Sequence, residues 1–347
     1  MKRHTSQTDK QREGVYYTSH AASLLTGYEH VVRGEYVTEP FAGGGDITRW
    51  CYESGAHFVM EYDKNANRSP VIQNDSIMNP VLLNNVVVTN PPYLARNKCK
   101  DKTAFDFWET NDLYKCHLAA IARSAMDMMS PTVEKGVLIL PSNFLSERSS
   151  FARDLFFSYY RMNHVKYYYT QEFDDATTGI CVFDFELWEP QQEMTCQVDV
   201  YYEEDVFTQQ MTFHEDDGWL CGREFFKTIR RAPHYKVKIL REGDTPDSNI
   251  VIGLLDKGKY PLGAHYNDGP PIYCAEKAFT TYQCVLGREL TEQQQHLAVV
   301  RFNDILYQMR EKYHSLFLSN YMGGEQKILS RHYAERLLNY AIQEQTQ

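Results

Sequence analysis

An apolar run at residues 86–89 ends in the sequence Asn90-Pro91-Pro92-Tyr93. If the run is a strand, its carboxyl end carries an amide, two residues that cannot donate a backbone hydrogen bond, and an aromatic ring. Proline cannot continue a central strand, so a rigid turn with no further role would explain the two prolines. A binding site at the strand end would explain all four residues, and the neighbouring strand ends favour the binding site.

The first of these neighbouring strand ends carries a glycine run, within the segment TEPFAGGGD at residues 38–46. Three consecutive glycines leave the backbone open to a ligand where the next helix begins, although tight strand–helix turns also use glycine. The segment has neither the GxxxxGKS/T nor the GxGxxG spacing of phosphate-binding loops. A ligand at this position therefore need not be phosphorylated.

Carboxylates mark the ends of the next two strands, in the segments MEYD (60–63) and QNDS (73–76). An acid about 20 residues after a glycine turn suits a ribose, whose two hydroxyls can donate to both carboxylate oxygens. Glu61 is the first candidate and Asp63 the alternative, and either could instead be a surface acid. Asp75 is placed to accept a hydrogen bond from an exocyclic amine of adenine. Together, the strand ends carry groups suited to a nucleoside.

The elements that must position these residues alternate between residues 36 and 187. Short apolar runs predict strands at residues 35–40, 57–63, 70–75, 85–90, 136–141, 164–170 and 179–187. Helical spacing of apolar residues predicts helices at residues 46–54, 111–130 and 150–161. This alternation predicts an α/β fold with a mostly parallel, Rossmann-like sheet covered by helices on both faces, which binds ligands at the carboxyl ends of its strands.

After residue 190 the alternation stops, and irregular turns precede helical patterns near the C-terminus. We therefore expect a flexible N-terminal tail at residues 1–13, a first domain at residues 14–190 and a second domain at residues 191–347. Residues 325–342 predict a final amphipathic helix, whose apolar face suits core packing.

The composition is that of a globular protein of about two domains, with 347 residues of which 43% are hydrophobic. No apolar run approaches the roughly 18–20 residues of a membrane span. The charged N-terminus lacks a secretory signal region, and the eight cysteines show no CxxC spacing. We therefore expect a cytoplasmic protein with reduced thiols, no metal site and no membrane partner.

The net charge of −10 is unevenly distributed along the chain. Residues 171–217 contain 14 acidic and no basic residues, whereas residues 223–241 contain seven basic residues and one acid, Glu224. A basic stripe beside an acidic region suits a protein that meets a polyanion with one surface. A solvated cationic face is the alternative interpretation of the same stripe.

Five motifs, taken in order, resemble those of a known family. The segments GVYYTSHAA (14–22), EPFAGGGD (39–46), EYD (61–63), ND (74–75) and NPPY (90–93) resemble motifs X, I, II, III and IV of amino-group DNA methyltransferases. Their order, with the tyrosine–threonine motif first and a long C-terminal extension last, resembles the gamma class, which mostly makes N6-methyladenine. The resemblance covers residues 14 to about 187. FAGGG departs from the family, where the central position of motif I is often Cys or Ser.

The resemblance implies a binding site for S-adenosyl-L-methionine along the first four strand ends and the N-terminal motif. The cofactor-binding residues it implies are Tyr17, Thr18, Glu39, Pro40, Phe41, Ala42, Gly43, Glu61, Tyr62, Asp75, Ser76 and Asn90. Ser19 departs from the family, which commonly has proline after the threonine.

The resemblance also implies catalytic roles for Asn90, Pro91, Pro92 and Tyr93. In the family, the asparagine oxygen and the first prolyl carbonyl accept hydrogen bonds from the target amine, whose lone pair is shared with the base. Two fixed acceptors favour a pyramidal nitrogen and stabilise the positive charge that forms on it. The prolines fix the backbone and lower the cost of reorganisation. The methyl group then passes directly to nitrogen, without a covalent intermediate.

A base in duplex DNA must be flipped out of the helix to reach such a site. The resemblance implies that Tyr93 stacks on the flipped base and that Phe173, in the loop before the last strand, faces it from the other side. An ordinary core aromatic is the alternative for Phe173. The second domain would then recognise the target. Contacts to the DNA backbone are predicted for Arg96, Lys98, Arg230, Arg231, Lys236 and Lys238, although the first two also suit a solvated loop.

The sequence leaves three functions open. The first is site-specific methylation of N6 of a flipped adenine in double-stranded DNA by a monomer, with cytosine N4 as an alternative target and a separately encoded restriction endonuclease as a hypothetical partner. The second follows from enzymes that carry NPPY after the same fold and methylate ribosomal-RNA guanine or protein glutamine. The third is a catalytically silent DNA-binding specificity protein.

Overall fold

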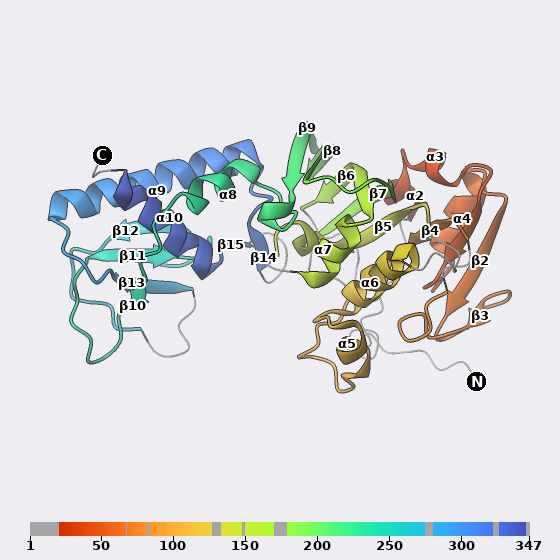
Figure 1. The fold of residues 1–347 in the computed structure, drawn as a ribbon, viewed down its shortest axis with the longest axis horizontal. Coiled ribbons are helices and arrows are strands. Elements are labelled where there is room, and N and C mark those ends of the chain that lie inside the picture. The colour runs from red at the N-terminus through yellow and green to blue at the C-terminus, as the bar shows by residue number, and fades with distance from the viewer. Residues whose placement is uncertain are drawn as a thin grey trace. The chain divides into compact units, whose positions relative to one another are not determined.

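The computed structural model describes residues 21–66, 68–81, 84–126, 133–147, 150–169, 179–274, 280–321 and 326–344. The chain divides into two compact units, which are described separately (Figure 1). The first unit comprises Met1–Phe144 and Ser149–Trp219, and the second unit comprises Leu145–Arg148 and Leu220–Gln347.

The first unit is built on a nine-stranded sheet in the order β3-β2-β1-β4-β5-β7-β6-β8-β9. The strands are β1 (Tyr36–Glu39), β2 (Phe58–Asp63), β3 (Ile72–Gln73), β4 (Val86–Thr89), β5 (Lys135–Pro141), β6 (Tyr160–Tyr168), β7 (Ile180–Leu187), β8 (Glu193–Tyr202) and β9 (Asp205–His214). Strands β3, β2, β1, β4 and β5 run parallel, and β7 is antiparallel to both its neighbours. The order reverses at β1, as in a doubly wound sheet, and the predicted Rossmann-like α/β fold is confirmed.

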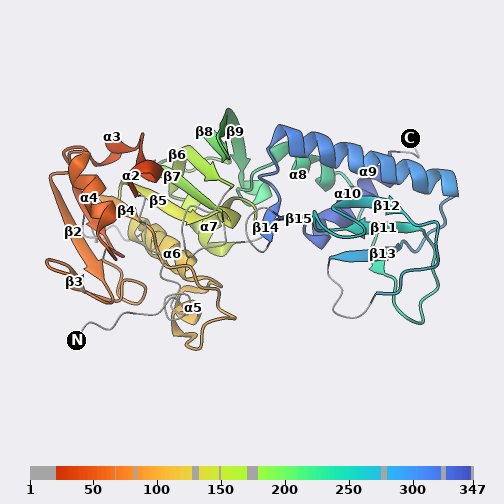
Figure 2. The ribbon, with the colours of Figure 1, turned by 180° about the vertical axis from the view of Figure 1, so that it is seen from behind.

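Helices cover both faces of this sheet, as Figures 1 and 2 show. On one face, α2 (Ala21–Leu25), α3 (Glu29–Val32) and α4 (Asp46–Glu53) pack on alternate strand residues such as Val86 and Val88. On the other face, α6 (Leu113–Met126) packs beside α7 (Phe151–Phe157), where Phe156 contacts two rings of β7. Burial on both faces explains why these strands are continuous apolar runs in the sequence.

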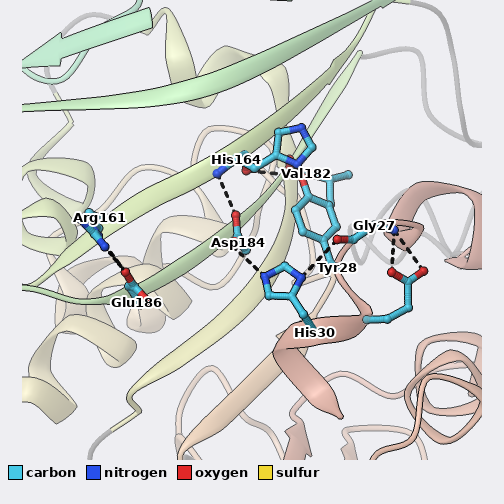
Figure 3. A network of polar contacts seen from close by, with 9 residues as sticks. Gly27, Tyr28, His30, Arg161, His164, Val182, Asp184 and Glu186 are labelled. Atoms are coloured by element: carbon cyan, nitrogen blue, oxygen red, sulfur yellow. Dashed lines mark hydrogen bonds and ion pairs between the residues drawn. The ribbon is translucent and has the colours of Figure 1, made fainter. Parts of the chain in front are cut away.

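A polar network ties the segment between α2 and α3 to the far half of the sheet (Figure 3). The buried Tyr28 hydroxyl donates to the carbonyl of Val182 at 3.0 Å. The imidazole of His30 lies 3.6 Å from the carboxylate of Asp184, which also accepts from the backbone N–H of His164 at 2.8 Å. Burial raises the pKa of Asp184 above its usual value, and these donors oppose that shift. The network therefore fixes β6 and β7 against the helical layer.

The antiparallel pair β8 and β9 extends the same sheet beyond β6. Strand β8 runs parallel to β6, with His164 opposite Gln197, and the His164 Nε2 atom lies 2.7 Å from the carboxylate of Asp199. The boundary that the sequence indicated near residue 190 thus differs from the structure, which divides the chain between Trp219 and Leu220. The difference arises because β8 pairs with a strand distant in sequence, a contact that local periodicity does not reveal.

The second unit contains a four-stranded antiparallel sheet in the order β10-β13-β11-β12 and a hairpin of β14 and β15. These strands are β10 (Lys238–Ile239), β11 (Ile250–Gly253), β12 (Gly263–Tyr266), β13 (Thr281–Val285), β14 (Ser319–Tyr321) and β15 (Gln326–Ile328). Its helices are α8 (Arg223–Arg230), α9 (Glu292–Lys312) and α10 (Arg331–Gln343). None of the helices in the described part of the chain is long and apolar enough to cross a bilayer.

Two predicted helices are shorter than their apolar patterns indicated. The pattern at residues 150–161 continues into β6, so α7 ends at Phe157. The pattern at residues 325–342 begins with β15, and the helix starts only after Ser330, whose hydroxyl accepts from the N–H of Tyr333 at 3.3 Å. Strand pairing of β6 ends the first helix early, and the Ser330 cap sets the start of the second. Neither helix therefore extends over its whole apolar pattern.

Arg153 of α7 is a fully buried cation that holds two carbonyl groups of the first unit. Its Nε donates to Gly218 and its Nη1 to Phe144, both at 2.7 Å. Arg153→Met is expected to lower the free energy of unfolding by about 2–4 kcal/mol, because the buried Phe144 carbonyl and the partly buried Gly218 carbonyl lose a charged donor. Urea denaturation of the two proteins measures the difference.

Arg161→Met is the matched control, because Arg161 pairs with Glu186 on the surface (Figure 3). An exposed pair contributes less than about 1 kcal/mol. Equal losses of stability in the two variants would contradict the structural role given to Arg153.

Candidate active site

A cavity of about 340 Å³ lies at the carboxyl ends of the parallel strands. Of the predicted cofactor residues, six line this cavity: Phe41, Ala42, Gly43, Asp75, Ser76 and Asn90. Pro92 lines it as well. Glu39, Pro40, Glu61 and Tyr62 are buried and do not contribute to its surface. The structure therefore brings the glycine loop, the third strand end and the NPPY segment together around one space.

Glu39, the last residue of β1, is a fully buried carboxyl group. Its Oε1 accepts from the Thr89 hydroxyl at 2.6 Å and from the Phe41 N–H at 3.2 Å, whereas its Oε2 has no partner among the described residues. Burial raises the pKa of Glu39 to about 8, against the lowering effect of these two hydrogen bonds. The group is therefore held mostly protonated at neutral pH, unless a cation reaches its second oxygen.

The glycine run forms a tight loop between β1 and α4. Its Gly43 N–H donates to Asp63 Oδ2 at 2.8 Å, and the neighbouring Ala42 N–H donates to the Tyr62 carbonyl at 2.8 Å. Gly45 has a φ of 85° and precedes the first residue of α4. A side chain there would be strained by this φ, so glycine is required.

Asp63, rather than Glu61, is the acid at the end of β2 that faces the cavity. Its two oxygens accept from the N–H groups of Gly43 and Asn65, at 2.8 and 2.7 Å. A carboxylate has about four acceptor sites, so further donors can still bind. Glu61 is buried under the guanidinium of Arg68, with which it forms an ion pair. Asp63, which the sequence left open as the alternative to Glu61, is thus the accessible acid in this structure.

Asp75 and Ser76 form the part of the cavity wall that follows β3. Asp75 Oδ1 accepts from the Ile77 N–H at 3.3 Å, and its Oδ2 pairs with Lys64 Nζ at 2.8 Å. The Ser76 hydroxyl accepts from the Asn74 amide at 3.0 Å. These side chains are fixed at the cavity by local turns, which are set by the Asn and Asp residues themselves.

Asn90 follows β4 directly and is 7% exposed. Its Oδ1 accepts from the Tyr93 hydroxyl, which also lies 2.7 Å from the Ile139 carbonyl of β5. This contact holds the Asn90 amide against the Tyr93 hydroxyl at the cavity wall. Asn90 is therefore a pre-oriented acceptor at the cavity.

The Tyr93 ring is 8% exposed and meets the edge of Tyr114 at 6.2 Å between centroids. It does not line the cavity, whereas Pro92 does. Stacking of Tyr93 on a base therefore stays a prediction, and in this structure the residue acts through its hydroxyl on Asn90.

His117 of α6 is a residue that the sequence analysis missed. It is 1% exposed, and neither ring nitrogen has a hydrogen-bond partner within the described chain. Its ring meets the edge of the cavity residue Phe41 at 5.0 Å, and Leu113, one turn earlier, lines the cavity. Burial lowers the pKa of His117 to about 3, so the imidazole is neutral at physiological pH. Its spacing from Leu113 on a helix is the only sequence signal that could have indicated it.

Two predicted residues of the loop after NPPY do not line the cavity, and three others cannot be placed relative to it. Tyr17, Thr18 and Phe173 fall outside the described residues, so their roles stay predictions. In the loop after NPPY, Lys98 is exposed and Arg96 forms an ion pair with Asp106, at 2.6 Å.

The predicted basic stripe lies in the second unit, and its four candidate cations are exposed: Arg230, Arg231, Lys236 and Lys238. Helix α10 fixes the backbone that carries them. Arg336 donates to the carbonyls of Ile229 at 3.1 Å and Arg230 at 2.8 Å, and Asn339 donates to the Tyr235 carbonyl at 2.8 Å. The cations therefore project from a backbone that is anchored on one side.

No protein-family model matches the chain, and no curated protein matches its sequence. Solved structures do match. The modification subunit of a type I restriction enzyme from Vibrio vulnificus is 11% identical at a TM-score of 0.43, over 60% of this chain and 58% of that one. A class I S-adenosylmethionine-dependent methyltransferase from Listeria monocytogenes is 12% identical at a TM-score of 0.40, over 54% of this chain and 67% of that one.

An RNA methyltransferase from Pyrococcus horikoshii is 14% identical at a TM-score of 0.33, over 51% of this chain and 90% of that one. The chain spans 58%, 38% and 51% of three restriction–modification proteins that it matches. No function transfers at this level of likeness, so an assignment depends on the residues of this chain.

Glu39→Gln is expected to change how stability depends on pH. A carboxyl group whose pKa is raised on folding stabilises the protein below its unfolded pKa, and this contribution is lost as pH rises through the folded pKa. For Glu39 the loss falls between the ordinary pKa of 4.5 and about 8. The neutral amide of Gln cannot ionise, so the variant should gain on the order of a few kcal/mol over the wild type between pH 5 and pH 9.

Denaturation of both ligand-free proteins across this pH range measures the effect, since all other titrating groups are common to the two. Parallel pH profiles for wild type and variant would contradict the account of Glu39.

Proposed function

We propose that this chain is an S-adenosylmethionine-dependent DNA methyltransferase that acts on an exocyclic amine, and specifically on N6 of adenine. The observation that supports it most is that Asn90 and Pro92 line the same cavity as the glycine loop and the acids Asp63 and Asp75. A methyl donor that contains a nucleoside and an amine that accepts the methyl group must meet in one space. The cavity joins the groups suited to each.

The residues of the cavity fit this cofactor. Asp63 retains acceptor sites for the hydroxyls of a ribose, and Asp75 and Ser76 supply polar groups for an adenine edge. Glu39 Oε2, which has no partner among the residues that the structure describes, would lose its burial penalty on meeting a positively charged amino group. When bound, S-adenosylmethionine supplies an electrophilic methyl group on a sulfonium.

Asn90 would act on the amine that receives the methyl group. Asn90 lines the cavity, and a hydrogen bond from the amine to its Oδ1 would draw electron density toward the nitrogen. The backbone of Pro91 is fixed in φ, so its carbonyl is the second acceptor we assign. Both groups are neutral, and they stabilise positive charge on the nitrogen in the transition state more than in the ground state.

The reaction needs no nucleophile from the protein. With the cofactor bound, the amine nitrogen would take the methyl group while the electrons of the carbon–sulfur bond stay on sulfur. The nitrogen would then carry the positive charge and would lose one proton to solvent to become neutral. The protein contributes orientation, fixed acceptors and exclusion of water, which are the main sources of catalysis when no covalent intermediate forms.

Duplex DNA is the partner we assign, with the second unit as the recognition module. The exposed cations on the backbone segment held by Arg336 and Asn339 form a surface suited to phosphates. Tyr235 within this segment is 54% exposed and lies 4.4 Å beneath the guanidinium of Arg288. An aromatic ring among cations can pack on the sugars or bases of a nucleic acid.

Incubation with labelled cofactor and duplex DNA, followed by digestion to nucleosides, tests the proposed function. Label is expected in N6-methyldeoxyadenosine. Asn90→Ala is expected to reduce its formation by about 10²–10³-fold, with cofactor binding retained, because one fixed acceptor is lost. Asn85→Ala at the other end of β4 is the matched control, since Asn85 is exposed, and it should keep full activity.

Label in N4-methyldeoxycytidine would correct the target base. Label in RNA or protein instead of DNA would favour the RNA or glutamine methyltransferases, and cofactor binding without transfer to any acceptor would favour a silent specificity protein.

The double variant Arg231→Gln/Lys236→Gln tests the DNA surface. Each phosphate contact contributes about 0.9 to the slope of log affinity against log salt concentration, so the slope should fall by about 2 for binding to any duplex. Fluorescence anisotropy at several salt concentrations measures it. Lys257→Gln/Lys259→Gln, which removes two exposed charges elsewhere in the second unit, should leave the slope unchanged. Equal slopes for all three proteins would contradict the assigned surface.

A further inference from the structure

The loop between β2 and β3 places a cation on each of two acids that the sequence assigned to the adenosine half of the cofactor. Arg68 forms an ion pair with Glu61, the first candidate for the ribose. Lys64 Nζ lies 2.8 Å from Oδ2 of Asp75, the candidate for the adenine amine. One short loop thus occupies both acids in the structure.

Arg68 also fills the space that the glycine run opens. A Cβ atom built on Gly45 would lie 2.5 Å from the Arg68 Cζ, and the Arg68 Nε lies 3.4 Å from the Gly43 carbonyl oxygen. The glycines therefore admit a guanidinium in this structure, in the place where their lack of side chains would admit a ligand. The cavity runs past Asp63 and Asp75, and neither Glu61 nor Arg68 contributes to its surface.

The two cations differ in how firmly they are held. The Glu61 side chain is 5% exposed, and a buried carboxylate that loses its counter-ion is costly. Arg68 is 29% exposed, so its guanidinium has a route toward solvent once another donor serves Glu61. Lys64 is 73% exposed, and a pair of this kind contributes little. Arg68 is therefore held more firmly than Lys64, and its ion pair should affect ligand binding more.

We propose that Arg68 competes with the ribose of the methyl donor for Glu61, so that Glu61 joins Asp63 in binding the ribose only in molecules from which Arg68 has left. This competition sets the affinity for the methyl donor, with a minor contribution from Lys64. This inference rests on the proposed cofactor site. The apparent affinity equals the intrinsic affinity multiplied by the fraction of molecules in which Arg68 has left Glu61. Removing the guanidinium should raise that fraction to one. If Arg68 stays in place and Asp63 alone serves the ribose, removal should change nothing.

Isothermal titration of wild type and Arg68→Gln with S-adenosylmethionine, and separately with adenosine, tests the proposal. Gln keeps much of the side-chain length without the charge. Arg68→Gln is expected to bind both ligands at least about fivefold more tightly, as for an open fraction of about 20% or less in the wild type. Lys64→Ala should change either affinity by less than about twofold.

Arg161→Gln, which removes an exposed arginine from a surface pair far along the sheet, is the control and should leave both affinities unchanged. Thermal unfolding shows whether Arg68→Gln is folded. Its midpoint without ligand should be lower than that of the wild type, because Glu61 is left without a counter-ion, and its rise on adding S-adenosylmethionine should be larger. Arg68→Lys, which keeps a cation, should fold and bind with wild-type affinity.

Unchanged or weaker binding by a folded Arg68→Gln, while the wild type binds, would overturn the proposal, since weaker binding means that Arg68 contacts the ligand favourably. A wild-type protein that binds no S-adenosylmethionine would instead overturn the proposed function. The two failures are therefore distinct.

Discussion

The parallel pairing of β1 with β2 places Glu39 opposite Glu61, and both carboxyl groups are buried at the same edge of the sheet. Two carboxylates cannot share a poorly solvated site without a proton or a counter-charge. The chain meets this constraint in two ways. Burial and the nearby charge of Glu61 raise the pKa of Glu39 to about 8, and Arg68 pairs with Glu61. The ligand-binding properties of the edge follow from how these two charges are compensated.

The same constraint connects the acids to the NPPY segment. Thr89 donates to Glu39 and directly precedes Asn90, so the end of β4 is tied to the end of β1. Tyr93 then links Asn90 to the Ile139 carbonyl on β5. The segment that carries Asn90 is thus tied to β1 through Thr89 and to β5 through Tyr93. This preorganisation is what a group needs if it is to stabilise charge without moving during the reaction.

Much of the first unit could be predicted from the sequence, because strands buried on both faces are continuous apolar runs and their order fixes which ends meet. The placement of Phe41, Gly43, Asp75 and Asn90 around one cavity followed from that order. The ion pair of Arg68 with Glu61 could not be predicted. Arg68 lies in a loop, and the periodicity of apolar residues does not indicate the path of a loop.

The pairing of β8 with β6 escaped prediction for a related reason. It is a long-range contact, so the end of alternation near residue 190 was interpreted as a domain boundary. His117 was missed because a histidine within an apolar helix is usually a core residue. Only its place beside Phe41 and its lack of a hydrogen-bond partner in the described part of the chain distinguish it.

A crystal structure with sinefungin, a donor analogue that carries an amine in place of the transferable methyl group, tests the central claim most directly. The analogue should lie in the cavity between the glycine loop and the NPPY segment. That amine should lie within about 5 Å of the Asn90 Oδ1 atom, close enough for an acceptor nitrogen to contact both. Sinefungin bound elsewhere, or with that amine more than about 10 Å from Asn90, would contradict the account.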